Sequence, residues 1–430
     1  MPMPEHFDWR AAYPDKVITP EAAAATVRSG DRVNCGIAEP VAFLEALGAR
    51  SDLENVTLFV PAPRRGGVAA AGNPGITLVA PFVSQIFRQS GVSAEMIPLR
   101  LQDWAGYVRR NPARVSVVQV ASPLADGTVR PGSVMGGNAA MVDRPRGPDD
   151  LVFGLVNPVV PQVHGDAFTI DDFDALIEIP SEGATPVYDE RRPPDELEPF
   201  IGALDELIPH GATVQSGIGG LTEVALSAMT HKRDLGIHTE VLSQGLIDLM
   251  RSGAATGARK TVYPHVAVFT ISLPETFAYI DDNPACRITH ADVALDPRVI
   301  AQNRDMRCIN SAVEVDLLGQ VNAEMIGGVQ FSGVGGQLDF LRGCQLSDDA
   351  LSIHMLASVA GKSGTSRIVP RIGTNTVTGT RYDTQVVVTE HGVAWLRDAT
   401  VRQKAERLIA IAHPDHREEL TDAARRDGLL

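Results

Sequence analysis

The fold of this chain is decided by a short stretch, Ser29-Gly-Asp-Arg-Val-Asn-Cys-Gly-Ile37, that recurs in altered form as His210-Gly-Ala-Thr-Val-Gln-Ser-Gly-Ile218. Both copies read Gly-x-x-Val-x-x-Gly-Ile at one offset, and both lead into a helix-like pattern. The next strand-like runs, Val56-Thr-Leu-Phe-Val60 and Ile237-His-Thr-Glu-Val241, align at the same offset. Internal similarity of this kind indicates repeated structural units. The chain is therefore predicted to consist of two related halves.

Apolar runs of strand length alternate with helical patterns along the chain, as at Val115–Val120 and Leu151–Val156. This alternation is typical of α/β proteins, in which helices connect the strands of a mainly parallel sheet. The segment 179–194 is rich in proline and charge and shows no periodicity, so it is predicted to link two domains. We expect two structurally similar open α/β domains with mainly parallel central sheets, spanning residues 1–190 and 191–430.

The composition is that of a globular protein large enough for two cores. Of the 430 residues, 44% are hydrophobic and 21% are charged, which excludes a disordered chain. The formal net charge of -15 argues against a nucleic-acid partner but allows an anionic small ligand bound by backbone N–H groups. No apolar run is long enough to span a membrane, and the N-terminus lacks a signal pattern. We therefore expect a cytoplasmic protein without a membrane partner.

The cysteines and histidines show no metal-binding pattern. The four cysteines lie far apart with no Cys-x-x-Cys pair, so buried free thiols are expected, and neither a zinc site nor a disulfide framework. His413 and His416 flank a proline and do not form a dependable helical pair. No metal site is predicted.

A carboxylate interrupts the second copy of the repeat. At the common offset Glu240 falls on Phe59, so a strand position that is apolar in the first half is acidic in the second. A buried ionised carboxylate must be paired, hydrogen-bonded or exposed at a cleft. Clefts in open α/β sheets lie beyond the carboxyl ends of strands, and the turn Ser243-Gln-Gly245 follows directly. A solvated glutamate at a strand end is the simpler alternative.

Two glycine-rich turns could bind an anion through their backbone. The first, Gln215–Leu221, lies between a predicted strand at 212–215 and a predicted helix at 222–229, and the second lies within Phe331–Phe340. Glycine lets another group approach the main chain, so their N–H groups could hold a phosphate or a developing oxyanion. The first turn fails as a dinucleotide fingerprint, because Thr222 stands where the third glycine is required. Tight turns without function remain the alternative.

Two further acidic clusters follow strand-like runs. Glu314 and Asp316 alternate with apolar residues, which a half-exposed strand turning at Leu318-Gly319 explains without catalysis. Glu390 and His391 are predicted to lie after a buried strand and before a helix. That position is typical of ligand-facing residues, although a carboxylate at a helix N-terminus is also stabilised without any function.

Several long motifs occur in an order that resembles a known family. They are Asn157–Gly165 (NPVVPQVHG), Gly217–Gly220 (GIGG), Thr239–Gly245 (TEVLSQG), Ile309–Glu324 (INSAVEVDLLGQVNAE), Ser332–Phe340 (SGVGGQLDF), Val388–Gly392 (VTEHG) and Leu408–His416 (LIAIAHPDH). Over nearly its whole length the chain resembles the acetyl-CoA hydrolase/transferase family, class I CoA-transferases that include 4-hydroxybutyrate, butyrate and succinate:acetate CoA-transferases.

The resemblance implies a site and a substrate. Glu240 matches the family's catalytic glutamate, and the backbone amides of Ile218 and Gly336 match its two oxyanion-hole donors. Residues implied to line the substrate and CoA site, at the interface of the two domains, are Gly217, Gly219, Gly220, Gly333, Gly335, Lys362 and Glu390. A coenzyme A thioester would be the substrate, no cofactor would be bound permanently, and the protein would be a homodimer or a larger homo-oligomer.

The implied reaction is ping-pong transfer of CoA from an acyl-CoA to a free carboxylic acid. The glutamate would form an acyl-glutamyl anhydride and then a glutamyl-CoA thioester. Hydrogen bonds to its charged form, and not desolvation alone, are expected to set its pKa. Acyl-CoA hydrolysis at the same glutamate and a non-catalytic CoA-binding sensor remain as alternatives.

The chain departs from the family at Leu295, where many relatives carry an asparagine near the substrate. An apolar side chain there indicates an altered preference for the acid, or a packing change without consequence.

Overall fold

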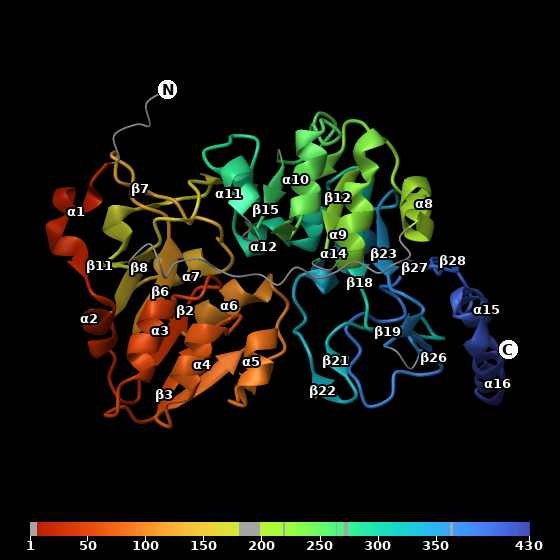
Figure 1. The fold of residues 1–430 in the computed structure, drawn as a ribbon, viewed down its shortest axis with the longest axis horizontal. Coiled ribbons are helices and arrows are strands. Elements are labelled where there is room, and N and C mark those ends of the chain that lie inside the picture. The colour runs from red at the N-terminus through yellow and green to blue at the C-terminus, as the bar shows by residue number, and fades with distance from the viewer. Residues whose placement is uncertain (1–6, 180–197, 218–219, 264, 271–273, 362–363) are drawn as a thin grey trace. The chain divides into compact units, whose positions relative to one another are not determined.

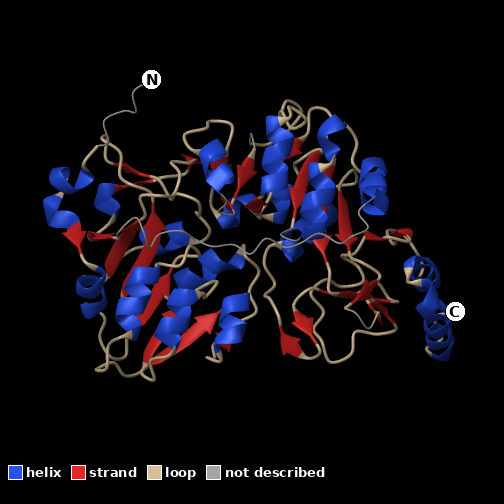
Figure 2. Ribbon diagram, in the orientation of Figure 1, coloured by secondary structure: helices blue, strands red, loops and turns tan. Residues whose placement is uncertain are grey.

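The chain divides into two compact units in its structure, which is a computed structural model. The first unit comprises Met1–Tyr188 and Val268–Asp292, and the second comprises Asp189–Ala267 and Val293–Leu430. The structure describes residues 7–179, 198–217, 220–263, 265–270, 274–361 and 364–430, so almost all of the predicted linker lies outside it. Helices and strands alternate in both units (Figure 2), which confirms the predicted α/β class.

The first unit is built on an eight-stranded sheet (Figure 1). In spatial order its strands are β1 (Val17–Ile18), β11 (Ala175–Glu178), β8 (Leu151–Val156), β6 (Val115–Val120), β2 (Arg32–Cys35), β3 (Val56–Phe59), β4 (Ile76–Ala80) and β5 (Glu95–Met96). All neighbouring strands run parallel. The two runs predicted as strands from their apolar sequence are β6 and β8, and both are buried along almost their whole length, as central strands of a parallel sheet should be.

Helices cover both faces of this sheet. The first unit contains the helices α1 (Trp9–Ala12), α2 (Pro20–Ala25), α3 (Val41–Gly48), α4 (Arg65–Ala71), α5 (Gln85–Ser90), α6 (Asp103–Arg110), α7 (Asn138–Val142) and α11 (Pro274–Ile280). Successive strand residues point to opposite faces. On one face Val33 and Leu58 share an apolar cluster with Leu44 of α3. On the other face the ring of Phe59 lies 4.9 Å from that of Tyr107 in α6.

The second unit is built on a six-stranded sheet. In spatial order its strands are β13 (Gly236–Ile237), β12 (Thr213–Ser216), β18 (Met306–Ser311), β23 (Leu351–Met355), β27 (Val386–Thr389) and β28 (Gly392–Trp395). All pairs run parallel except the last, β27 with β28. The helices of this unit are α8 (Glu198–Leu207), α9 (Gly220–Ser227), α10 (Gln244–Arg251), α13 (Pro297–Ile300), α14 (Gln337–Gln345), α15 (Val401–Ile411) and α16 (Arg417–Arg426).

This sheet too has helices on both faces. On one face Cys308 of β18 places its Sγ 3.1 Å from that of Cys344 in α14. On the opposite face the Nε of Arg307 donates to the carbonyl of Leu207, at the end of α8, over 2.7 Å. All four cysteines are buried free thiols, as predicted. No helix within the described parts of the chain is both long and apolar enough to cross a bilayer.

The two sheets repeat one arrangement of strands. The order β3-β2-β6-β8-β11 in the first unit corresponds to β13-β12-β18-β23-β27 in the second, which confirms two similar domains. The first strand of each repeat aligns as the sequence predicted, with Gly36 matching Gly217. The N–H of Gly36 donates to the carbonyl of Val117 in β6, and the N–H of Gly217 donates to the carbonyl of Ile309 in β18, which is the corresponding strand.

The second strand of each repeat aligns differently from the prediction. Thr57 donates to the carbonyl of Asp31, and Gly236 donates to that of Ala212. Asp31 and Ala212 are 181 positions apart, whereas Thr57 and Gly236 are 179 apart, so the predicted alignment of β3 with β13 was wrong by two residues. By register, Phe59 corresponds to His238 and Glu240 corresponds to Pro61.

Short strands form the rest of the second unit. They are β14 (Val241–Leu242), β15 (Val266–Ala267), β19 (Glu314–Asp316), β20 (Val321–Asn322), β21 (Met325–Ile326), β22 (Val329–Gln330), β24 (Val359–Ala360), β25 (Thr365–Ser366) and β26 (Ile368–Val369). β19 and β20 form the hairpin predicted at Leu318-Gly319. Asp316 is buried and accepts hydrogen bonds from Leu318 and Gln320 of that turn, so its role is structural.

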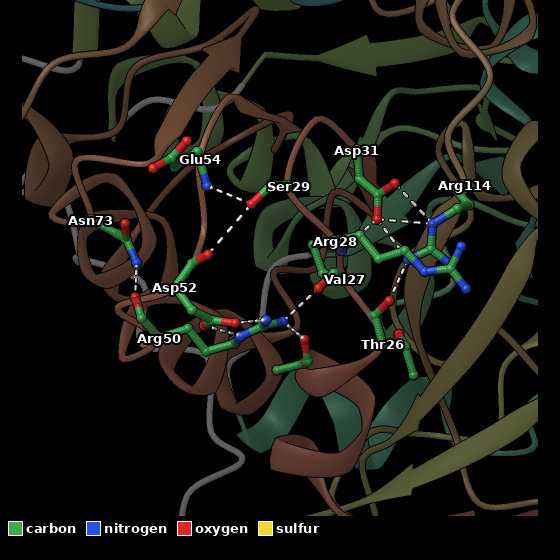
Figure 3. A network of polar contacts seen from close by, with 11 residues as sticks. Thr26, Val27, Arg28, Ser29, Asp31, Arg50, Asp52, Glu54, Asn73 and Arg114 are labelled. Carbon is green, nitrogen blue, oxygen red and sulfur yellow. Dashed lines mark hydrogen bonds and ion pairs between the residues drawn. The ribbon is translucent and has the colours of Figure 1, made fainter.

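Polar contacts fix the chain at the amino ends of the strands in the first unit (Figure 3). Arg114, just before β6, donates from Nε and Nη2 to both oxygens of Asp31, just before β2, over 2.6–2.9 Å. Both side chains are largely buried. Burial acts to raise the pKa of Asp31, but the hydrogen bonds from Arg114 and from the N–H of Arg28 outweigh it, so the pKa is lowered. The pair of Arg50 and Asp52 lies nearby and is more exposed.

Asp31→Asn should destabilise the first unit by about 1–3 kcal/mol at pH 7, because it leaves a largely buried guanidinium without its partner. A lowered carboxyl pKa means that the ion pair stabilises the fold above about pH 4 and is lost as the pH falls through the folded-state value. The difference in urea midpoint between the variant and the natural chain should therefore shrink below that pH. Asp52→Asn is the matched control, and an equal effect there would contradict the assignment.

Candidate functional site

Glu240 lies at the carboxyl end of the outermost parallel strand of the second unit. It follows β13 and precedes β14, in a bend of the chain, so the expectation that it would lie within a strand was wrong. Hydrogen bonds anchor the two residues before it: His238 donates to Val214 and Thr239 donates to Val266, each over 3.1 Å. Glu240 itself is half-buried. The backbone thus holds a carboxylate where ligands bind in open α/β sheets.

The second glycine turn meets this carboxylate. Gly336 is the N-cap residue of α14, and its N–H donates to Oε2 of Glu240 over 2.7 Å. A β-carbon on Gly336 would stand closer to Oε2 than any real contact allows, so with any other residue here the carboxylate would have to shift from its present position. Gly335 has a φ of +59° and turns the chain into the helix. A β-carbon on Gly335 would lie 3.9 Å from both carboxylate oxygens.

Burial determines the protonation of Glu240. It raises the pKa of the carboxyl group from 4.5 to about 7, and the single hydrogen bond from Gly336 lowers the pKa by less than burial raises it. The expectation that hydrogen bonds to the charged form would set this pKa was therefore wrong. A carboxylate with a raised pKa is more basic, and hence a stronger nucleophile, than an ordinary one.

The first glycine turn is only partly described. Gly217 follows β12 directly, and its carbonyl accepts a hydrogen bond from Oγ1 of Thr222 over 2.9 Å. Gly220 is the first residue of α9, which begins two residues earlier than predicted. Ile218 and Gly219 lie outside the described residues, as does Lys362. Their implied roles as oxyanion donor and ligand contacts stay predictions.

Glu390 is held by a different partner. It follows β27, as predicted, but the next element is β28 and not a helix, so that part of the prediction was wrong. The backbone N–H of Ser358 donates to its two carboxylate oxygens over 3.1 and 2.9 Å, and the hydroxyl of Ser358 donates to one of them. The structure therefore brings Glu240 together with Gly335 and Gly336, and it pairs Glu390 with Ser358.

Sequence inspection missed two features of this site. The turn Ser332-Gly-Val-Gly-Gly-Gln337 has a counterpart in the first unit, Ser133-Val-Met-Gly-Gly-Asn138, in which Gly136 has a φ of +50° and Gly137 caps α7. The shared Ser-x-x-Gly-Gly pattern could have revealed it. The second feature is the place of Leu295: the sequence singled this residue out, but not that it is fully buried with its Cδ1 3.2 Å from where a β-carbon of Gly336 would stand.

Comparison with known proteins relates this site to one family. Residues 273–424 match the family model described as acetyl-CoA hydrolase/transferase C-terminal domain. The chain is 36% identical to the succinyl-CoA:cyclohexane-1-carboxylate CoA transferase of Geobacter metallireducens, over 96% of each chain. It is 33% identical to the 4-hydroxybutyrate coenzyme A transferase of Clostridium kluyveri, over 97% of this chain and 99% of the relative. The crystal structure of RipA from Yersinia pestis superposes with a TM-score of 0.88 at 30% identity, over 99% of this chain and 100% of RipA.

Glu240→Gln should make the protein more stable at pH 8, by up to about 3 kcal/mol. A carboxyl group whose pKa rises from 4.5 to about 7 on folding destabilises the fold increasingly as the pH rises from 4.5 to 7, because the unfolded chain ionises first, and the full cost remains above pH 7. The glutamine is always neutral and can still accept from Gly336. The gain, measured by urea unfolding at pH 8, should vanish near pH 4.5.

Glu390→Gln is the matched control, and it should lose stability, because an amide offers one acceptor oxygen where Ser358 uses two. A loss of stability in Glu240→Gln at pH 8 would contradict the burial argument.

Proposed function

Because this chain belongs to the acetyl-CoA hydrolase/transferase family, we propose that it transfers CoA from an acyl-CoA to a free carboxylic acid with Glu240 as the nucleophile. The observation that carries the proposal is the hydrogen bond from Gly336 to a half-buried carboxylate at a strand end. A structural glutamate would gain nothing from the space that Gly336 leaves for its oxygen, nor from a pKa near 7.

The first half-reaction begins with attack by one oxygen of Glu240 on the thioester carbon. The tetrahedral intermediate collapses, the bond from carbon to sulfur breaks, and CoA leaves as a thiolate with an acyl-glutamyl anhydride on the protein. Oε2 is the oxygen bound by Gly336, and none of the described residues donates a hydrogen bond to Oε1, so Oε1 is the proposed nucleophile. The hydrogen bond then orients the carboxylate for attack.

The second step uses the same N–H differently. The thiolate attacks Cδ of Glu240, the negative charge moves onto a side-chain oxygen, and the free acid leaves, so that a glutamyl-CoA thioester remains. The N–H of Gly336 already points at that oxygen and stabilises the developing charge without reorganisation. An incoming carboxylate reverses both steps and departs as the new acyl-CoA. Ile218 is the second proposed donor, and the remaining glycines, Lys362 and Glu390 are proposed to line the substrate and CoA site.

Leu295 bears on the choice of acid. Its side chain packs against the position of Gly336 and offers no hydrogen bond where many relatives carry an amide. An acid with an apolar body suits such a neighbour better than one with a second polar group. The relative from Geobacter metallireducens is named for cyclohexane-1-carboxylate, an acid of that kind.

Incubation with an acyl-CoA alone should leave a CoA-sized mass on the peptide that contains Glu240. A carboxylic acid should discharge the adduct rapidly, whereas water should do so slowly. Glu240→Gln and Glu240→Ala should form no adduct and lose turnover. In Glu240→Asp the carboxylate keeps its charge but lies one methylene group closer to the backbone. Intact-protein and peptide mass spectrometry measure each outcome. Discharge by water at the same rate would make the protein a hydrolase. Binding of CoA with neither adduct nor turnover in the natural chain would leave a CoA-binding sensor, and full turnover in Glu240→Ala would reject Glu240 as the nucleophile.

The pH profile should follow the nucleophile. Because only the ionised carboxylate attacks, kcat/KM should fall about tenfold per pH unit below 7 and level off above it. A profile that breaks near pH 4.5 would contradict a buried nucleophile.

Gly336→Ala should lower kcat by roughly 10²–10³, because the added methyl group displaces Oε2 from its donor. Gly373→Ala is a matched control in the same unit, since neither Gly336 nor Gly373 has a positive φ and nothing lies within 4 Å of the β-carbon position of Gly373. Equal losses of kcat in both variants, measured on folded protein, would show that the loss does not depend on contact with Glu240 and would remove Gly336 from the mechanism.

A further inference from the structure

We propose that His238, a buried side chain two residues before Glu240, is a positioning residue that holds the nucleophile against Gly336. The inference rests on the proposed function, because it assigns a role within the same site. His238 has no exposed surface, and its ring nitrogens face two different partners.

The tautomer of His238 follows from these partners. Nε2 lies 2.7 Å from the carbonyl oxygen of Ala294, which can only accept, so Nε2 carries the proton. Nδ1 is then the acceptor, and it faces Nζ of Lys260 at 3.3 Å. Burial, and then the charge of Lys260, lower the pKa of His238 to about 3, so the ring is neutral. A neutral ring with both nitrogens partnered is a stable occupant of an interior site.

Lys260 is built into the same position. Its Nζ also donates to the carbonyls of Val262 and Tyr263, so its three N–H bonds meet three acceptors. Its aliphatic carbons lie 3.0–3.1 Å from where a β-carbon of Gly236 would stand. A side chain at that position of β13 would therefore press on the lysine where it crosses the strand to reach His238.

His238 connects β13 to both segments beside Gly336. Ala294 precedes Leu295, which packs against the β-carbon position of Gly336. The ring of His238 also lies edge-on to that of Phe340, with centroids 6.5 Å apart, and Phe340 is one turn into α14. The histidine therefore ties the strand end that carries Glu240 to the helix that supplies its hydrogen bond. A displacement of about 1 Å in such a geometry can cost roughly 10²-fold in rate.

The internal repeat supports this role independently. In the first unit the counterpart of Glu240 is Pro61, and the counterpart of His238 is Phe59, which packs on an aromatic ring. A phenylalanine fills the equivalent place in the repeat whose strand end carries Pro61 instead of the glutamate. The polar side chain is found in the repeat that carries the acid.

His238→Phe is the direct test, since Phe59 occupies the equivalent position in the first unit. On folded protein, kcat and the rate of CoA-adduct formation should fall about 10–100-fold, with KM changed less than threefold. The amide of His238→Gln can still donate to the carbonyl of Ala294. The kcat of this variant should therefore be at least tenfold higher than that of His238→Phe. Lys260→Met keeps the aliphatic stem and should cause a smaller loss of kcat than His238→Phe.

Two outcomes would overturn the inference. The first is an unchanged kcat in folded His238→Phe. The second is an equal loss of kcat in His238→Phe and His238→Gln, because the hydrogen bond to Ala294 would then have no effect on the rate. If His238→Phe does not fold, the kcat of His238→Gln and Lys260→Met decides, and unchanged values in both would reject it. Glu240→Gln is assayed in parallel. Its full activity would reject the proposed function itself, whereas its inactivity beside a fully active His238→Phe would reject the present inference alone.

Discussion

One hydrogen bond, from the backbone of Gly336 to Oε2 of Glu240, is the interaction on which the site depends. It is made by the N-cap residue of α14, whose N–H group is free for such use because the first turn of a helix has no internal acceptor. The donor cannot move without moving the helix. A carboxylate placed beside it therefore has one defined oxygen bound, and among the described residues no donor meets the other, which is the asymmetry that the proposed nucleophile would use.

The cost of that arrangement is electrostatic. Burial opposes the ionised form of Glu240 more strongly than one neutral hydrogen bond favours it, and the pKa is raised to about 7. The same burial makes the carboxylate more basic and would limit water around the acyl intermediate that we propose. Stability is given up at the point where reactivity is gained, as in many sites whose groups have shifted pKa values. His238, whose ring is neutral, and Lys260 hold the adjoining strand without adding a second carboxylate.

Duplication explains how such a site can be tolerated. Both units use the same strand order and a paired-glycine turn before a helix, at Gly136-Gly137 and at Gly335-Gly336. In the first unit the turn accompanies Pro61 and Phe59, and the strand end is ordinary packing. The scaffold is thus stable without the carboxylate, and one copy carries the chemistry.

The sequence by itself determined the α/β class, the strands β6 and β8, the internal repeat, the family and the candidate glutamate with its second glycine turn. These rest on local patterns: apolar periodicity, glycine spacing and motif order. Tertiary structure alone decided the two-residue slip of β13, the strand after Glu390, the dominance of burial over hydrogen bonding at Glu240, and the connection through His238. Each of those depends on which distant backbone groups meet, such as Gly236 with Ala212 or His238 with Ala294, and hydrogen-bond register and desolvation are properties of packed neighbours that no local pattern contains.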